Sequence, residues 1–193
     1  MGSITRTLAN NLTTGLGTKT ALEFITSATP SGNPAVMEFQ NCFSSSYRNY
    51  KIIMSGMAIQ TTNSDMVFRL QTGASVHSSS NYYWSIGTSN RGNSSVTEYA
   101  DADSRGRFTS NTHNDNDTIS FEFFVSQPEV SGHKTTLGWF GGDRYSTQAY
   151  AHAQQGHCWV NSGNQFDGIR FYSASGYNWR DEGKILIYGL TDS

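Results

Sequence analysis

Residues of the types that bind metal ions occur in two places in the chain. His152, His157 and Cys158 could all serve as zinc ligands, but residues five apart on one strand point to opposite faces of a sheet. Asp115 and Asp117, in HNDNDTIS, begin like a calcium-binding loop, yet the glycine at its sixth position and the glutamate at its twelfth are missing. We therefore expect no metal site and no cofactor, with calcium at Asp115 and Asp117 as the alternative that the sequence leaves open.

Carboxylates could support glycoside hydrolysis only as a convergent pair. Glu98, Asp101 and Asp103 lie close together in the sequence, and so do Asp181 and Glu182. All five fall in polar, loop-like contexts, where a solvated charge is the ordinary role. The chain also contains no Gly-x-Ser-x-Gly run for a nucleophilic serine. The sequence thus predicts that the protein is not an enzyme.

Aromatic side chains offer a different chemistry, the binding of sugars. Many of them stand near asparagine, glutamine or aspartate at the ends of expected strands. Aromatic residues also fill protein cores and subunit interfaces, so the two interpretations remain side by side. The residues that we expect to contact a glycan are Tyr82, Tyr83, Trp84 and Trp179.

The composition limits the kinds of protein that this chain can be. Its 193 residues suffice for one sizeable domain, and 13% aromatic with only 15% charged residues is typical of an all-β domain with polar, uncharged loops. The formal net charge is -2 and no basic run occurs, which argues against nucleic-acid binding. No stretch approaches the roughly 20 apolar residues of a membrane helix. Cys42 and Cys158 are expected to be buried free thiols, with a disulfide between them left open.

From Ala35 onward the apolar residues recur with a period of two, which predicts β-strands. No helix-period segment follows residue 34. The number and spacing of the segments favour an all-β fold, an antiparallel β-sandwich that is jelly-roll-like and has about nine strands. The expected strands are 36–43, 50–60, 65–73, 81–87, 118–127, 135–141, 149–160, 168–173 and 184–190.

Several segments carry more detailed expectations. Gly56 interrupts a strand pattern and predicts a bulge or a sharp bend. The strands at 168–173 and 184–190 are separated by about ten residues and are expected to form a hairpin with a broad loop. The second of them, KILIYGL, is apolar on both faces and should lie inside its sheet rather than at an edge. The polar stretch 87–117 is expected to be a long loop.

The first 34 residues differ from the rest. Four leucine and isoleucine residues in the first 16 positions recur every four residues, which fits about three helical turns with one thin apolar stripe. Such a helix is marginal alone and needs a partner surface, which could lie on its own domain or on a neighbouring subunit. We expect residues 1–34 to be an anchoring arm and linker and residues 35–193 to be the sandwich domain. The attachment residues would be Ile4, Leu8, Leu12 and Leu16.

Three stretches point to a known kind of protein. They are FQNCFSSSYRNYKIIMSGM (39–57), the terminal GKILIYGLTDS (183–193) and the leader TRTLANNLTTG (5–15). Together they resemble the β-sandwich domains in virion proteins of tailed phages, especially marine and cyanobacterial ones. The resemblance is thin between residues 60 and 183, and no catalytic residues come with it.

The resemblance implies a role on the virion, as a short fibre, a knob or a capsid-decoration protein. Proteins of this kind are commonly homotrimers that attach through an N-terminal segment to other virion proteins of the capsid, neck or tail. We therefore expect a non-enzymatic structural protein located in the virion, without nucleic-acid or membrane partners. The alternative is a glycan-binding module on the virion that recognises the host surface.

Overall fold

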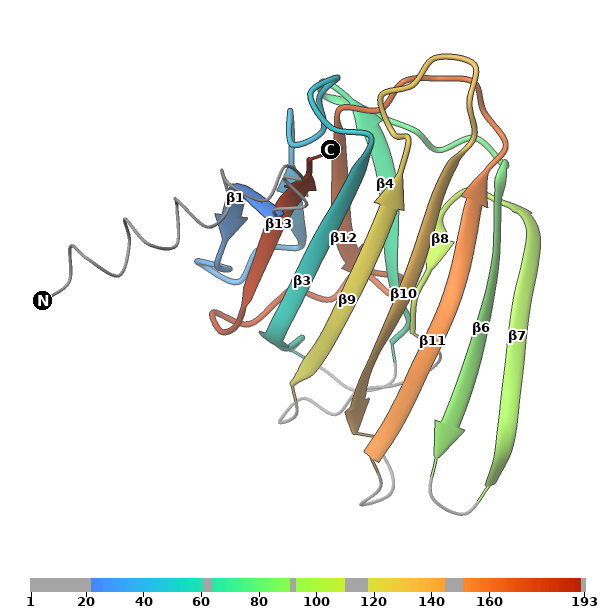
Figure 1. The fold of residues 1–193 in the computed structure, drawn as a ribbon. Coiled ribbons are helices and arrows are strands. Elements are labelled where there is room, and N and C mark those ends of the chain that lie inside the picture. Colours follow the sequence, from blue (N-terminus) through green and yellow to red (C-terminus); the bar gives the residue numbers. More distant parts are fainter. Residues whose placement is uncertain (1–21, 61–63, 91–92, 110–117, 145–150, 192–193) are drawn as a thin grey trace, which may run out of the picture.

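The computed structural model describes residues 22–60, 64–90, 93–109, 118–144 and 151–191. In these residues thirteen strands form two antiparallel sheets, of eight and five strands, that pack face to face (Figure 1). The expected antiparallel β-sandwich is therefore confirmed. No helix in the described part of the chain is long and apolar enough to cross a membrane.

The larger sheet has the strand order β1-β13-β3-β9-β10-β11-β6-β7 and is nearer the viewer in Figure 1. Its centre is the meander β9-β10-β11, in which each strand pairs with the next along the chain. In the order of the sheet, the strands are β1 (Leu22–Ala28), β13 (Lys184–Leu190), β3 (Asn49–Met57), β9 (Ile119–Ser126), β10 (Thr135–Arg144), β11 (Ala151–Val160), β6 (Tyr82–Asn90) and β7 (Asn93–Asp103).

The smaller sheet lies behind the larger one in Figure 1 and covers one of its faces. Its strands follow the order β2-β12-β4-β5, and a two-residue strand, β8, also pairs with β4. These strands are β2 (Val36–Phe39), β12 (Gly168–Ser173), β4 (Met66–Thr72), β5 (Ser75–Val76) and β8 (Gly106–Arg107).

Alternation along the strands explains why the two sheets pack together. In β9 the residues Ile119, Phe121, Phe123 and Val125 are buried, and the residues between them are not. Because successive side chains of a strand point to opposite faces, this arrangement directs one apolar row into the space between the sheets. Phe123 packs there against Phe171 of the smaller sheet, with ring centroids 5.4 Å apart. Burial of such side chains is worth about 1.5–3 kcal/mol each, which makes this layer the main source of stability.

All nine expected strands are present, and four more lie outside them. The strand β7 falls within 87–117, so the expectation of a long loop there was wrong for residues 93–103. Its serine, asparagine and threonine residues suit a strand here because β7 pairs with only one neighbour in the described structure, at the edge of the sheet. The two-residue strands β5 and β8 are too short to leave a periodic pattern.

The boundary of the sandwich lies earlier than expected. Residues 22–28, assigned above to the arm and linker, form β1 and pair with β13 over nearly its whole length. The sandwich therefore already includes Leu22–Ala28, which precede residue 35. The attachment residues Ile4, Leu8, Leu12 and Leu16 lie outside the described residues, as do Asp115 and Asp117.

The last strand is in the expected place, but its expected hairpin is not formed. β13 lies between β1 and β3, inside the larger sheet, which confirms the interpretation of KILIYGL as an inner strand. β12 belongs to the smaller sheet, so the chain crosses between sheets from β12 to β13, and the hairpin expectation was wrong. The intervening segment has partners of its own, because Trp179 donates its backbone N–H to the carbonyl oxygen of Pro34 at 2.8 Å.

Two local expectations are also confirmed. Gly56 lies where the pairing of β3 with β9 shifts register, between Met54 and Met57, and its φ of 63° is in the left-handed region that favours glycine. Cys42 and Cys158 are free, buried thiols. Burial raises the pKa of Cys42 to about 12 and raises that of Cys158 as well.

Candidate functional site

The outer face of the larger sheet, the one turned away from the smaller sheet, carries an unusual number of exposed apolar side chains. In the described part of the chain six large hydrophobic residues are exposed, and five of them lie on this face. Their positions follow from the alternation, since the register pairs them with other outward-pointing residues. They form two groups, one on β1 and one on β9 and β10, with a single tyrosine apart on β7, and exposed apolar groups that cluster in this way mark binding or assembly sites. The five residues are Leu22, Phe24, Tyr99, Phe124 and Phe140.

An ion pair divides this outer face into two regions. Lys51 of β3 and Glu122 of β9 lie on neighbouring strands, with Nζ 2.7 Å from Oε2. On one side, over β1, β13 and β3, lies a surface that we call the apolar patch. On the other side, over β9, β10, β11 and β6, lies a surface that we call the groove. The apolar patch consists of Leu22, Phe24, Ile53, Leu186, Tyr188 and Leu190.

The groove is formed by small and polar residues in register across three strands. Gly138, His157 and Ser85 are paired neighbours on β10, β11 and β6, and two residues further along the strands the row is Phe140, Gln155 and Gly87. Around these two rows lies a hollow of about 500 Å³. A second hollow of about 370 Å³ shares Gly87, Phe140 and Gln155 with the first and continues it along the strands. The two hollows thus make one groove that follows the strand direction.

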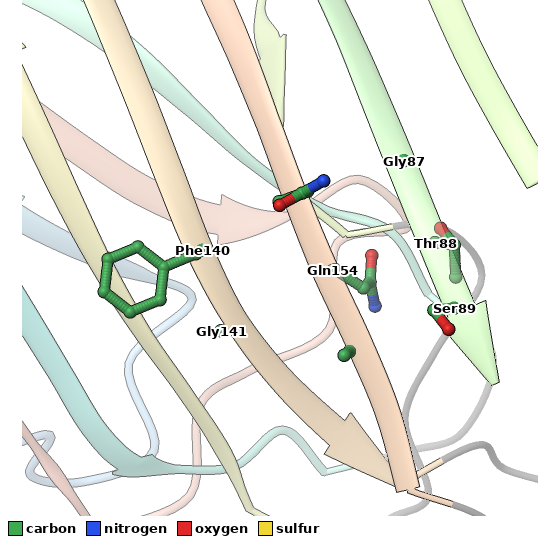
Figure 2. Close-up of a pocket in the computed structure, with 8 residues that line it drawn as sticks. Gly87, Thr88, Ser89, Phe140, Gly141 and Gln154 are labelled. Atoms are coloured by element: carbon green, nitrogen blue, oxygen red, sulfur yellow. The ribbon is translucent and has the colours of Figure 1, made fainter. Parts of the chain in front are cut away.

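Figure 2 shows how the strands place the side chains of the second hollow. Phe140 extends from β10 toward β9, whereas Gly87, Thr88 and Ser89 follow one another along β6. On β9 the ring of Phe124 lies nearly parallel to that of Phe140, with centroids 6.4 Å apart and an interplanar angle of 25°. Phe124 is 44% exposed and Phe140 is 50% exposed, so the two rings form an open apolar platform along one side of the groove.

Two glycines leave the bottom of the groove without side chains. A Cβ atom placed on Gly138 would meet no heavy atom within 4 Å, and one on Gly87 would meet only Gln155, at 3.9 Å. Gly156 is different, because its Cβ would lie 2.4 Å from the ring of Trp139, on the buried side of the sheet. Gly156 is therefore required for packing, whereas the space above Gly138 and Gly87 is open to a ligand.

A second aromatic stack lies at the end of the groove next to Ser85 and His157. Tyr83 of β6 and Trp159 of β11 are paired neighbours, and their rings stack at 4.6 Å with an interplanar angle of 23°. The ammonium group of Lys134 lies 6.0 Å from the centroid of the Trp159 ring, a favourable cation–π geometry. Of the residues expected to contact a glycan, Tyr83 is the one that borders the groove.

The other three aromatic residues expected to contact a glycan are buried. Tyr82 accepts a hydrogen bond from the backbone N–H of Leu70 and donates one to the carbonyl oxygen of His77, both at 3.0 Å. Burial raises the pKa of Tyr82. Trp84 and Trp179 likewise lie in the core, and the indole N–H of Trp179 points to the carbonyl oxygen of Phe171 at 3.3 Å. These three side chains offer almost no surface to a ligand.

Four of the five acidic residues considered for hydrolysis have structural contacts, since Asp181 accepts a hydrogen bond from the backbone N–H of Asn33 and Glu182 lies 3.5 Å from the guanidinium group of Arg180. Glu98 lies 2.9 Å from the guanidinium group of Arg107, which also pairs with Asp65. Asp103 accepts hydrogen bonds from the Trp84 indole and from a backbone N–H. Among the described residues no three histidine, cysteine, aspartate or glutamate side chains converge as they would around a metal ion.

The residues of the groove were not predicted from the sequence, although the positions of two phenylalanines indicate an exposed surface there. Phe124 and Phe140 occupy positions that the period-two pattern assigns to the solvent side of their strands. A phenylalanine at such a position has an exposed ring, which is a sign of a contact surface. No family model, curated protein or solved structure matches this chain.

Proposed function

We propose that this protein is a non-enzymatic structural protein of a tailed-phage virion. It is a short fibre, knob or capsid-decoration component that forms a homotrimer and attaches to other virion proteins through the residues that precede β1. The observation that carries this proposal is the apolar patch. A chain that worked alone would leave this surface in water, where it favours association.

The apolar patch has the features of a surface that a second chain covers. Phe24 is 55% exposed, and its ring meets that of Tyr188 edge to face at a centroid distance of 5.8 Å. The patch lies next to the edge strand β1, which has no second neighbour in the described structure. Exposed edge strands pair with other chains unless they are protected. Apolar side chains and free backbone groups therefore meet at the same end of the sheet.

The size of the patch indicates that it is one part of a larger interface. Covering the exposed halves of Leu22 and Phe24 is worth about 1 kcal/mol each. Association costs at least about 4 kcal/mol in lost freedom of motion, so these two side chains cannot hold subunits together alone. Residues 1–21 precede Leu22 of this patch in the chain. We assign the remaining contacts to those residues.

The resemblance to virion proteins agrees with this location. Two of the stretches that carry it contain β3 and β13, which pair along their length beneath the apolar patch. Trimers whose identical subunits contact one another head to tail form closed rings, and such an interface requires two different surfaces on each chain. The patch would be one of them, and residues 1–21 would supply the other.

Incorporation into particles tests the proposal. Tagged copies of the chain are produced in infected host cells, and the purified particles are analysed for them. We expect the full-length form in the particles. A form lacking residues 1–20 should be absent from them, although its sandwich, including β1, stays folded. The double variant Leu22→Ser, Phe24→Ser should also be absent. Phe140→Ser is the matched control, because it removes a ring of similar exposure from the same face outside the patch, and it should incorporate normally. Normal incorporation of the truncated form would rule out attachment by the arm, and absence of the full-length form would rule out the virion role.

A further inference from the structure

We propose that the groove binds a short, uncharged oligosaccharide that lies along the strands β10, β11 and β6. This activity goes beyond the structural role proposed above, and it depends only on the groove. It would give the protein a second contact, with a carbohydrate on the surface that the particle meets.

The platform of Phe124 and Phe140 matches one side of a sugar ring. A pyranose ring has a face of C–H groups and a rim of hydroxyl groups. The two phenylalanine rings are nearly parallel and about half exposed, so they present a flat apolar surface for the C–H face. Aromatic side chains supply large, rigid contact areas at small entropic cost. The stack of Tyr83 and Trp159 offers a second such surface at the end of the groove.

The polar residues of the groove match the rim of a sugar. Ser85, Gln155 and His157 are exposed and lie on neighbouring strands around the open floor. A hydroxyl, an amide and an imidazole can each donate and accept hydrogen bonds, as sugar hydroxyls also do. A purely apolar ligand would leave these groups without partners, which costs binding energy. Ligand sites generally combine apolar walls with a few such orienting groups.

The charges around the groove favour a neutral ligand. Among the described residues that line it, none is a lysine, arginine, aspartate or glutamate. The nearest charged pair on the outer face, Lys51 and Glu122, is closed on itself at 2.7 Å. Two ammonium groups stand at the borders of the groove, Lys51 over the Phe124 ring at 5.7 Å and Lys134 over the Trp159 ring at 6.0 Å, but they already have partners in Glu122 and Asn161. A phosphorylated, sulfated or sialylated chain would therefore find no unpaired cation among the described residues that line the two hollows.

The dimensions favour a chain of sugars rather than a single ring. From the row of Ser85 to that of Ser89 the groove covers four residues of a strand, which is about 14 Å. Both hollows are continuous over that length, because they share three of their lining residues. A single ring would fill only one of the hollows and leave the other in water.

The test uses purified full-length protein and immobilised neutral oligosaccharides of glucose, galactose and N-acetylglucosamine, together with sulfated and sialylated forms. We expect binding to at least one neutral oligosaccharide. Phe140→Ala should weaken it at least tenfold because half of the platform is lost. Tyr177→Ala is the control, since this ring is 39% exposed but belongs to neither the groove nor the apolar patch, and it should bind like the parent.

A second variant keeps the test independent of any loss of folding. Gly138→Val places a side chain in a space that holds no other atom within 4 Å of the Cβ, so the variant should melt at the parent temperature while it obstructs the groove and weakens binding at least tenfold. Failure of the parent to bind any neutral oligosaccharide, binding to charged forms alone, or undiminished binding by folded Gly138→Val would overturn the proposal. None of these results depends on particle incorporation, so the virion role is judged separately.

Discussion

Gly156 and Gly138 lie on adjacent strands of one sheet, and the structure assigns them opposite responses to the same substitution. A Cβ atom on Gly156 would lie 2.4 Å from the carbonyl oxygen of Ser85 and 2.4 Å from the ring of Trp139. Real contacts of a Cβ atom are more than half an ångström longer, so either the strand or the indole must move. Trp139 is buried, and its ring cannot leave without opening a cavity.

The magnitude follows from these two ways of relieving the clash. Overpacking that the surroundings absorb costs about 1–3 kcal/mol, whereas complete loss of a buried tryptophan side chain costs about 3–5 kcal/mol. We therefore expect Gly156→Ala to lower the free energy of unfolding by about 3 kcal/mol. Gly138→Ala has open space and no left-handed φ, so it should raise the free energy of unfolding by about 0.5 kcal/mol through the lower entropy of the unfolded chain.

Urea unfolding followed by tryptophan fluorescence measures both changes. The m-value should stay the same in both variants, so that the shift in midpoint reports stability directly. Equal stability of Gly156→Ala and the parent would refute the assignment of Gly156 to the packed side of the sheet. A loss for Gly138→Ala as large as that for Gly156→Ala would refute the open floor of the groove.

Three further predictions concern the core. Native protein at pH 8 should not react with a thiol reagent at Cys42 or Cys158, because burial shields both thiols and raises the pKa of Cys42 to about 12. Both thiols should react at once in denaturant. Fast labelling of the native protein would contradict their burial. Because burial raises the pKa of Cys42 from 9.0 to about 12, the contribution of this thiol to the free energy of unfolding should be constant below about pH 9 and fall by up to about 1.4 kcal/mol per pH unit above it. The free energy of unfolding should therefore fall less steeply above pH 9 in Cys42→Ala than in the parent, and an equal slope in that variant would contradict the shift. Arg107→Met should lower the free energy of unfolding, measured in urea, by about 1–3 kcal/mol. The reason is that Arg107 pairs with two carboxylates and its guanidinium group lies 5.5 Å from the centre of the Trp84 ring. An unchanged unfolding midpoint would show that these ion pairs are solvated and contribute little.

The strands that the sequence predicted are those with a strong apolar period. In β9 the pattern indicates both the strand and its buried face, because burial imposes the alternation. β1 was assigned to a linker because its apolar residues Leu22 and Phe24 point outward instead of into the core. β7 was assigned to a loop because an edge strand can be polar and still be held by backbone hydrogen bonds to β6.

The long-range arrangement could not be obtained from local patterns. The segments at 168–173 and 184–190 are close in sequence, and proximity normally favours a hairpin. Here the intervening chain is held elsewhere, through the bridge between Ile59 and Trp179 and the hydrogen bond to Pro34. These partners are more than a hundred residues away from it, and no feature near residue 179 indicates them.

The candidate site was only partly accessible for the same reason. Tyr82, Tyr83 and Trp84 are consecutive, so alternation alone sends the first and third to one face and the second to the other. Which face is buried depends on the smaller sheet, whose position the sequence does not give. The open floor at Gly138 and the covered one at Gly156 look alike in the sequence and differ only in what packs above them.

If subunits associate through the apolar patch, as we propose, the isolated chain should form an oligomer in solution. Sedimentation equilibrium of the purified full-length chain measures its mass. We expect a species of three times the 21.3 kDa mass of the chain at micromolar concentration, and we expect the double variant Leu22→Ser, Phe24→Ser to be a monomer. A full-length chain that sediments as a monomer at tens of micromolar would contradict the proposed association.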